Sequence, residues 1–274
     1  MLAWLAAAAV QSDFVDFATV RRFQFNRLVL EGLRNTVVLS VLAQAVGIVL
    51  GVLFGAMRRS RNPVSSAVAW FYVWLFRGTP VIVQLLFWFN GVPTAFETLS
   101  IKVPFVDAYL YREPMVEFMT PFMAAFLGLA LNEAAYMTEI VRGAILSVDP
   151  GQVRAAQALG MTPAMAMRRI VFPQAVRVII PATGNEFISM LKTSSLATVV
   201  VFPELLTRAR GIYSTNLLVM ELLVVASIWY IALTSVASVG QYYLERRFAR
   251  GSAEELAPTP LQRVRRAVFR RPRL

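Results

Sequence analysis

The 274-residue chain contains neither cysteine nor histidine. It therefore has no disulfide bond, no thiol nucleophile and no metal site built on histidine ligands. Charged residues are also scarce: they make up 16% of the chain, whereas hydrophobic residues make up 57%. A soluble domain carries more charge and less apolar sequence, so this composition favours an all-α protein that crosses a membrane several times.

Five apolar runs reach the roughly 20 residues that a helix needs to cross the bilayer. They cover approximately residues 36–57, 64–90, 121–142, 176–202 and 217–243. A helix-compatible lead-in precedes the first run from Leu28. The chain shows no internal repeat, which disfavours a secondary transporter built from inverted repeats. We therefore expect five transmembrane helices.

The second run is interrupted by a polar, helix-breaking segment that comprises Arg77, Gly78, Thr79 and Pro80. Glycine and proline end or kink a helix, so the backbone groups freed here need other partners. The segment is a candidate gate or hinge within a kinked or tilted helix. The alternative is a purely structural kink that Arg77 holds in place.

Lysine and arginine are distributed unevenly among the predicted loops of this chain, whose net charge is +11. One set of loops, together with the C-terminal tail, carries 17 of these residues, whereas the opposite set carries four. The richer side of a membrane protein is cytoplasmic, so five helices place the N-terminus outside and the C-terminus inside. Because the basic residues flank apolar runs, nucleic acid is not expected as a partner.

Three regions follow from this topology. Residues 1–28 are an extracytoplasmic or interfacial segment, residues 29–248 the transmembrane domain, and residues 249–274 a basic cytoplasmic tail that contacts membrane lipid. The first ten residues lack the basic start of a signal peptide, so a short interfacial segment is favoured over a cleaved signal. Arg21, Arg22 and Arg27 would then lie outside, where an amphipathic helix on the membrane surface could hold them.

The connection between the third and fourth runs, SVDPGQVRAAQALGMTPAMAMRRIVFPQA, is polar, cationic and helix-forming. Asp149 and the proline after it break the preceding helix. Gly160 stands where a helix C-cap would fall, and Thr162 with its following proline can begin a new helix. The sequence thus predicts two short helices that meet at Gly160, before Pro173 turns the chain into the fourth run.

The spacing within this connection resembles the EAA loop of ABC importer permeases. That pattern is Glu-Ala-Ala, three residues, Gly, nine residues, Ile, one residue and Leu-Pro. The residues that match at these spacings are Ala155, Ala156, Gly160, Ile170 and Pro173. Phe172 replaces the leucine, and Arg154 replaces the glutamate. The alternative is an ordinary cytoplasmic connection stabilised by lipid headgroups.

Other segments resemble the polar amino acid importers of this class, the His/Glu/Gln/Arg/opine family. They are FRGTP at 76–80, TEIVRGAI at 138–145, FPQAVRVIIPATGNEFISMLKTSSL at 172–196 and FPELLTRA at 202–209. The loop from Thr94 to Met119 is longer than the connection usual in that family.

The resemblance implies a multi-pass permease subunit of the inner membrane that imports a polar amino acid. It further implies a dimer of ABC ATPase subunits that grips the coupling loop, a second permease chain, identical or paralogous, and an extracytoplasmic solute-binding protein. The sequence has no GxxxxGK[ST] phosphate loop, so ATP and Mg are expected on the partner ATPase. No catalytic residue, cofactor or metal is expected on this chain.

Arg154 reverses the charge of the family glutamate. A glutamate at a helix start complements the helix dipole, whereas an arginine opposes it by about 0.3–1 kcal/mol. We therefore expect a carboxylate close to Arg154, supplied either by the ATPase or by Asp149.

Polar residues also lie within the third and fourth runs, where a charge costs about 2.5–3.5 kcal/mol to insert. The candidate substrate-pathway residues are Glu133, Asn185, Glu186, Ser189, Lys192 and Thr193. Asn185, Ser189 and Lys192 share one face of a helix, at i, i+4 and i+7. Lys192 could meet the carboxylate of an amino acid, and Glu133 or Glu186 its ammonium. The alternative is that Lys192 and a glutamate neutralise each other and lock two helices together.

Two further patterns have simpler interpretations. Gly47, Gly51 and Gly55 form a small-residue stripe, which predicts close helix packing. A membrane-embedded enzyme would need a pair such as Ser194 and Lys192, but residues two apart do not face each other on a helix. A structural membrane subunit is the remaining alternative to a transport subunit.

Overall fold

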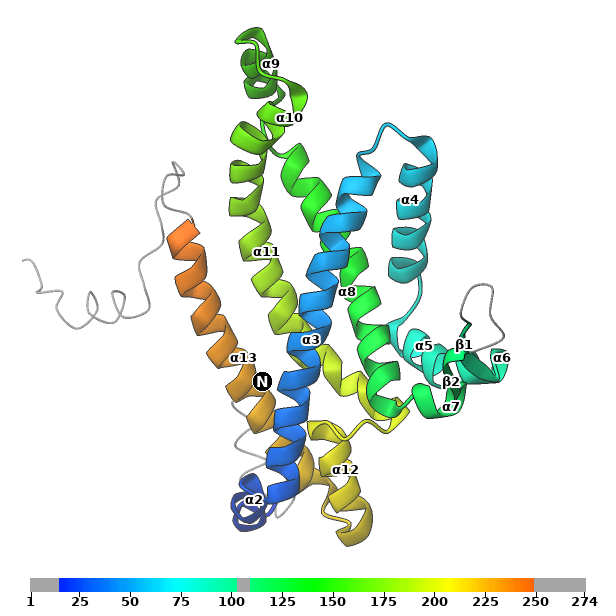
Figure 1. Cartoon of the computed structure of the whole chain (residues 1–274). Coiled ribbons are helices and arrows are strands. Elements are labelled where there is room, and N and C mark those ends of the chain that lie inside the picture. Colours follow the sequence, from blue (N-terminus) through cyan, green and yellow to red (C-terminus); the bar gives the residue numbers. More distant parts are fainter. Residues whose placement is uncertain (1–14, 103–108, 249–274) are drawn as a thin grey trace, which may run out of the picture.

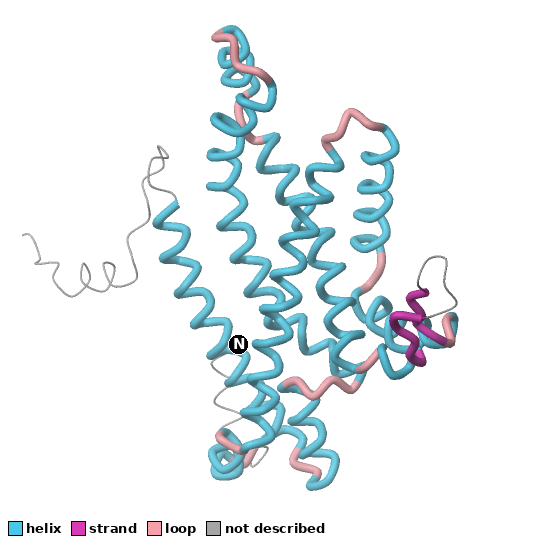
Figure 2. Tube along the Cα trace, viewed as in Figure 1, coloured by secondary structure: helices cyan, strands magenta, loops and turns pink. Residues whose placement is uncertain are grey.

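The computed structural model describes residues 15–102 and 109–248, and these residues are mostly helical (Figures 1 and 2). The helices are α2 Phe17–Gln24, α3 Arg27–Arg58, α4 Pro63–Gly78, α5 Val81–Leu86, α6 Val92–Ala95, α7 Met115–Phe118, α8 Pro121–Leu146, α9 Pro150–Ala158, α10 Pro163–Ala166, α11 Phe172–Thr193, α12 Leu205–Asn216 and α13 Val219–Phe248. Short helical turns join some of them: η1 Phe87–Gly91, η2 Met167–Val171 and η3 Ser194–Val200. The first 14 residues of the predicted interfacial segment and the predicted tail, 249–274, lie outside the described residues.

Helices α3 and α8 form the centre of the bundle, and the glycine stripe brings them together. A Cβ atom added to Gly47 would lie 2.5 Å from Cγ of Glu133, and one added to Gly51 would lie 2.3 Å from Cβ of Met137. The same is true of Gly55, where the added atom would lie 2.9 Å from a methyl group of Val141. These distances are shorter than van der Waals contact, so the predicted close packing through the stripe is confirmed.

Within the described residues, two single helices, α3 and α13, are long and apolar enough to cross a membrane. The number rises to four if each of two bent pairs is one span: α4 with Val81–Ala95, and Pro163–Val200 with α12. The expected third span, α8, has the length of a span, but Asn132 and Glu133 interrupt its apolar sequence at its centre.

The second apolar run is bent far more sharply than a kinked helix. The α4 helix ends at Gly78, and the segment Val81–Ala95 leaves it at an angle of 103°. Thr79 is extended, and Pro80 has no N–H group with which to continue the helix. The helix-breaking residues therefore turn the chain instead of kinking it, and the expectation of one kinked or tilted helix is wrong.

The fold is not wholly α-helical. β1 (Thr98–Lys102) and β2 (Tyr109–Pro114) pair in an antiparallel two-stranded sheet, in register Leu99 with Glu113. The segment TLSIK alternates polar and apolar residues, which is the period of a strand. The expectation of an all-α fold overlooked this alternation because the segment lies between the apolar runs.

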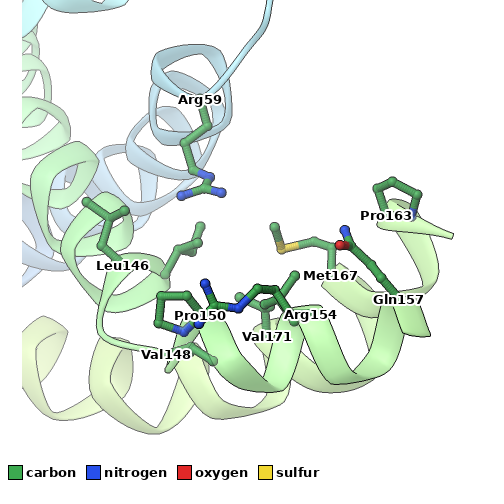
Figure 3. A pocket seen from close by; sticks show the side chains of 11 residues that line it. Arg59, Leu146, Val148, Pro150, Arg154, Gln157, Pro163, Met167 and Val171 are labelled. Carbon is green, nitrogen blue, oxygen red and sulfur yellow. The ribbon is translucent and has the colours of Figure 1, made fainter. Parts of the chain in front are cut away.

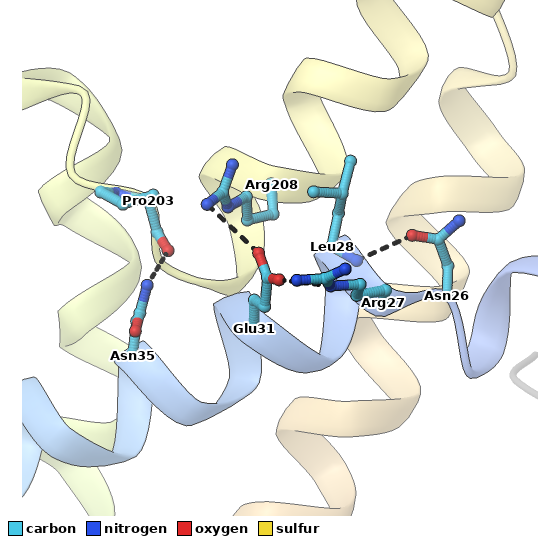
Figure 4. Close-up of polar contacts among 7 residues, drawn as sticks. All are labelled: Asn26, Arg27, Leu28, Glu31, Asn35, Pro203 and Arg208. Atoms are coloured by element: carbon cyan, nitrogen blue, oxygen red, sulfur yellow. Dashed lines mark hydrogen bonds and ion pairs between the residues drawn. The ribbon is translucent and has the colours of Figure 1, made fainter.

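The α12 helix was expected to be part of a loop, and polar contacts fix it to the bundle (Figure 4). Glu204 caps its N-terminus by accepting hydrogen bonds from the backbone N–H groups of Leu206 and Thr207. Glu31 of α3 pairs with Arg208 of α12 at 3.5 Å and with Arg27 at 2.9 Å. The Arg27–Glu31 pair lies within one turn of α3, whereas the Arg208–Glu31 pair joins residues far apart in the chain.

The expected N-terminal amphipathic helix is present in part as α2, which contains Arg21 and Arg22, whereas Arg27 begins α3. Val20 is buried, whereas Arg21 and Arg22 are exposed on the opposite side. Asp16 caps the helix by accepting a hydrogen bond from the N–H group of Ala18, and the hydroxyl of Thr19 lowers the pKa of this carboxyl.

Candidate functional site

The predicted coupling loop forms the tip of the molecule, at the end opposite α2 and α12 (Figure 1). Gly160 has φ +84°, a conformation that favours glycine and lets it end α9. The N–H of Met161 donates to the carbonyl of Ala156, and that of Gly160 to the carbonyl of Gln157, which is a Schellman motif. Thr162 then caps α10 by accepting from the N–H of Met165. The prediction that two helices meet at Gly160 is confirmed.

Pro173 does not turn the chain into the fourth run, contrary to expectation. Residues Pro163–Val200 form one continuous helical stretch in which α10 leads through η2 into α11. The N–H of Phe172 donates to the carbonyl of Met167, five residues earlier, so the turn before Pro173 is π-helical. We attribute the continuity to this wider turn, because it tolerates the missing N–H of proline.

The motif residues differ in exposure. Ala156 is buried and Ile170 is half-buried, whereas Ala155, Gly160 and Pro173 are exposed. Within the tip, α9 packs against α10 and η2, and the exposed residues form a surface.

Arg154 lies in the middle of α9, not at its start, so the helix dipole opposes it less than expected. The carboxylate of Asp149 instead caps α9 and accepts a hydrogen bond from the N–H of Gly151 at 2.7 Å. In the part of the chain that the structure describes, Arg154 and Asp149 form no ion pair. Asp149 is therefore not the carboxylate partner of Arg154.

The candidate pathway residues fall into two groups. Asn185, Ser189 and Lys192 lie exposed along one face of α11, and Thr193 is half-buried beside them. Lys192 makes no ion pair within the described residues, so the alternative of a neutralised helix-locking pair is not realised. Ser194 is buried and donates its hydroxyl to the carbonyl of Leu191, so it does not pair with Lys192 either.

The second group is internal. Glu133 of α8 is buried, and its carboxylate accepts a hydrogen bond from the Gln44 side chain of α3 at 2.9 Å. Glu186 of α11 is half-buried, close enough for its charge to be felt by Glu133 and for that of Arg77 on α4 to act on it. Gln44 was not predicted as a site residue, and only its position inside an apolar run could have indicated a role.

The side-chain amides of Gln84 and Asn132, neither of which was predicted as a site residue, hold the break after α4. The side-chain amide of Gln84 donates to the carbonyls of Phe76 and Thr79, at 2.8 and 3.1 Å, and to the Thr79 hydroxyl at 2.8 Å. The amide of Asn132 in α8 also donates to the carbonyl of Phe76, at 2.9 Å. These amides satisfy backbone groups that Gly78 and Pro80 set free.

Arg77 does not hold the break, so the alternative of a kink fixed by Arg77 is not supported. Its guanidinium lies over the ring of Tyr136, 5.0 Å from the centroid. It lines an open cavity of about 480 Å³ together with Trp74 and Glu139. Glu139 of α8 joins α3 and α8 there through its pair with Arg58 at 3.7 Å, and it also pairs with Arg142 of its own helix at 2.7 Å.

Gln84→Leu is expected to destabilise the isolated subunit by about 1–3 kcal/mol, because the part-buried carbonyl of Thr79 loses its side-chain donor and that of Phe76 keeps only Asn132. A lower midpoint of thermal unfolding in detergent would show this. Asn90→Leu is the matched control: Asn90 is exposed and donates only to the carbonyl of Leu86. Equal midpoints for the two variants would show that the amide network does not hold the break.

Among the described residues, no group of acidic side chains has the arrangement of a metal site. The candidate site comprises a polar helix face, an internal acidic cluster and a two-helix tip.

The fold and this site together define a membrane permease of the ABC transporter class. A solved crystal structure, described as an amino acid ABC transporter with histidines, has the same fold. Its TM-score is 0.73, and it is 36% identical in sequence, covering 85% of this chain and 99% of that one. The chain belongs to the family of binding-protein-dependent transport system inner membrane components, which matches residues 47–250. Components of this family are non-catalytic transport subunits of the inner membrane.

Individual relatives carry transport names. The arginine transport system permease protein ArgU of Corynebacterium glutamicum is 41% identical over 95% of this chain and 81% of its own length. The glutamine transport system permease protein GlnP of Escherichia coli K12 is 33% identical over 80% of this chain and 92% of its own length. The chain is therefore similar to permeases for polar amino acids along most of its length.

Proposed function

We propose that this chain imports a polar amino acid as one of two permease subunits that flank a shared pathway. A partner ATPase dimer supplies the energy, and an extracytoplasmic solute-binding protein supplies the substrate. The observation that carries this proposal is the α9–α10 tip, where the EAA spacing from Ala155 to Pro173 forms a partly exposed pair of helices beyond the ends of the bundle (Figure 1).

The exposed face of α11 supports the two-chain arrangement. A lysine at mid-membrane depth is costly unless it faces water or another protein. Lys192, Asn185 and Ser189 are exposed in the single chain and share this face. We propose that a second permease chain covers the face and that the amino acid passes between the two copies, near Glu133 and Glu186.

We further propose five spans, with the N-terminus outside and the C-terminus inside. The bent pair that begins with α4 is then the second span, and α8 the third, with its polar residues covered by α3 and α5. The tip and the turn between α3 and α4 lie at one end of the bundle, the basic side that we assign to the cytoplasm (Figure 1).

Single introduced cysteines test this orientation, because the chain has none of its own. Ser60 lies in the turn between α3 and α4, and Ser214 lies exposed on α12. An impermeant maleimide is expected to label Ser60→Cys only in inside-out vesicles and Ser214→Cys only in right-side-out vesicles. The reverse pattern would contradict the orientation.

Uptake by the reconstituted complex tests the function. Vesicles that contain this chain, its co-purified ATPase and the solute-binding protein are expected to accumulate labelled arginine or glutamine only when ATP is present. Unlabelled amino acids of different charge, added as competitors, then identify the substrate. An assembled complex that accumulates no amino acid with ATP would support a structural subunit instead.

A further inference from the structure

A cationic pocket lies between the tip and the turn that joins α3 to α4 (Figure 3). It has a volume of about 400 Å³. Arg59 lines one side of it, and Arg154 and Gln157 of α9 line the other. The remaining walls are apolar and include Met167 and Val171. Residues 95 positions apart in the sequence thus direct two guanidinium groups at one space.

Within the described residues, no carboxylate lines this pocket. The two nearest acidic residues in the sequence before Arg154 have other partners: Asp149 caps α9, and Glu139 pairs with Arg58 and Arg142. Two like charges that face one cavity with apolar walls repel each other, and an anionic group between them would remove this repulsion.

We propose that the Arg59–Arg154 pocket receives an aspartate or glutamate side chain of the partner ATPase. The proposal rests on the proposed function, because that function supplies the partner. Arginine suits this role, since its planar fork binds a carboxylate through two parallel hydrogen bonds. The apolar walls exclude water and strengthen the contact.

Charge complementarity favours an acidic protein surface at this place. The family pattern has a glutamate at position 154, so a relative presents the opposite charge there. A surface complementary to Arg154 is acidic, and Arg59 adds a second positive charge from another part of the chain. The tip also extends beyond the turn between α3 and α4 (Figure 1), on the side that we assign to the cytoplasm.

Carbodiimide cross-linking of the assembled complex tests this proposal directly. The reagent joins a lysine to a carboxylate in contact with it, and the chain has only two lysines, Lys102 and Lys192. Arg154→Lys and Arg59→Lys are each expected to give a cross-link to an aspartate or glutamate of the ATPase, located by mass spectrometry. Arg168→Lys is the matched control, because Arg168 is exposed on η2 but does not line the pocket.

Charge reversal provides the second measurement. Arg154→Glu is expected to lower the amount of co-purified ATPase about tenfold at low salt, which corresponds to about 1.4 kcal/mol of binding free energy. Salt screens exposed charges, so the difference from the unaltered chain should shrink at high ionic strength. Arg168→Glu, which changes the net charge equally, is expected to retain most of the ATPase.

The outcomes separate this proposal from the proposed function. If the unaltered chain retains the ATPase but neither pocket lysine cross-links to it, the pocket proposal is wrong and the function stands. If the ATPase is retained in vesicles of anionic phosphatidylglycerol but neither pocket lysine cross-links to it there, an anionic lipid headgroup occupies the pocket and the proposal is also overturned. If the unaltered chain retains no ATPase at all, the proposed function itself fails.

Discussion

Gly51→Ala is expected to unfold the subunit at a markedly lower temperature, although it adds a single methyl group. The new Cβ atom would lie 2.3 Å from Cβ of Met137 and 3.1 Å from its carbonyl carbon. These atoms belong to the backbone of α8 or lie next to it, so no side-chain rotation relieves the clash and the two helices must move apart. Overpacking of this kind costs about 1–3 kcal/mol or more.

Moving α3 away from α8 has a second consequence. It lengthens the hydrogen bond from Gln44 to Glu133, which is 2.9 Å and buried. A buried carboxylate that loses its hydrogen-bond donor destabilises the fold. This cost adds to the free energy of unfolding that the steric clash already removes. Gly51→Ala should therefore lower the midpoint of thermal unfolding in detergent more than the methyl group alone suggests.

The matched control is Gly240→Ala on α13. No atom lies within 4 Å of a Cβ atom added there. Alanine favours a helix over glycine by about 1 kcal/mol, so this variant is expected to keep or raise the midpoint. If Gly51→Ala and Gly240→Ala unfold at the same temperature, the glycine stripe is not what sets the distance between α3 and α8.

The features that could be predicted from the sequence are those specified by neighbouring residues. The Gly160 cap, the Thr162 start of α10 and the glycine stripe are local patterns, and the structure has all three. Apolar length likewise predicted helices near each of the five runs. The alternating strand at Thr98–Lys102 was also a local pattern, but it went unrecognised because its apolar residues are too few to form a long run.

The remaining features depend on contacts between distant segments. Nothing near Gln84 indicates that its amide would meet the carbonyl of Phe76, because the 103° bend brings them together. Arg59 and Arg154 share a pocket only because α9 folds back toward the turn between α3 and α4. Such pairings follow from helix packing, which a single sequence does not specify.

Lys192→Met is expected to abolish amino acid uptake while leaving the complex assembled. Lys192 is exposed on the α11 face that we assign to the pathway, and no ion pair involving it occurs among the described residues. Its charge thus stabilises no other helix, and methionine is cheaper than lysine to place in a membrane. The substitution should leave the midpoint of thermal unfolding unchanged or raise it, so a loss of uptake would not reflect misfolding.

A second substitution at this position separates charge from shape, because it keeps the charge and changes the shape of the side chain. Lys192→Arg keeps a cation at the same place and is expected to restore part of the uptake that Lys192→Met removes. If this charge attracts the substrate carboxylate during passage, and not only during capture, Lys192→Met should lower uptake at every amino acid concentration. Normal ATP-dependent uptake by Lys192→Met would exclude a role in the pathway and leave the exposed lysine as a contact to the second permease chain.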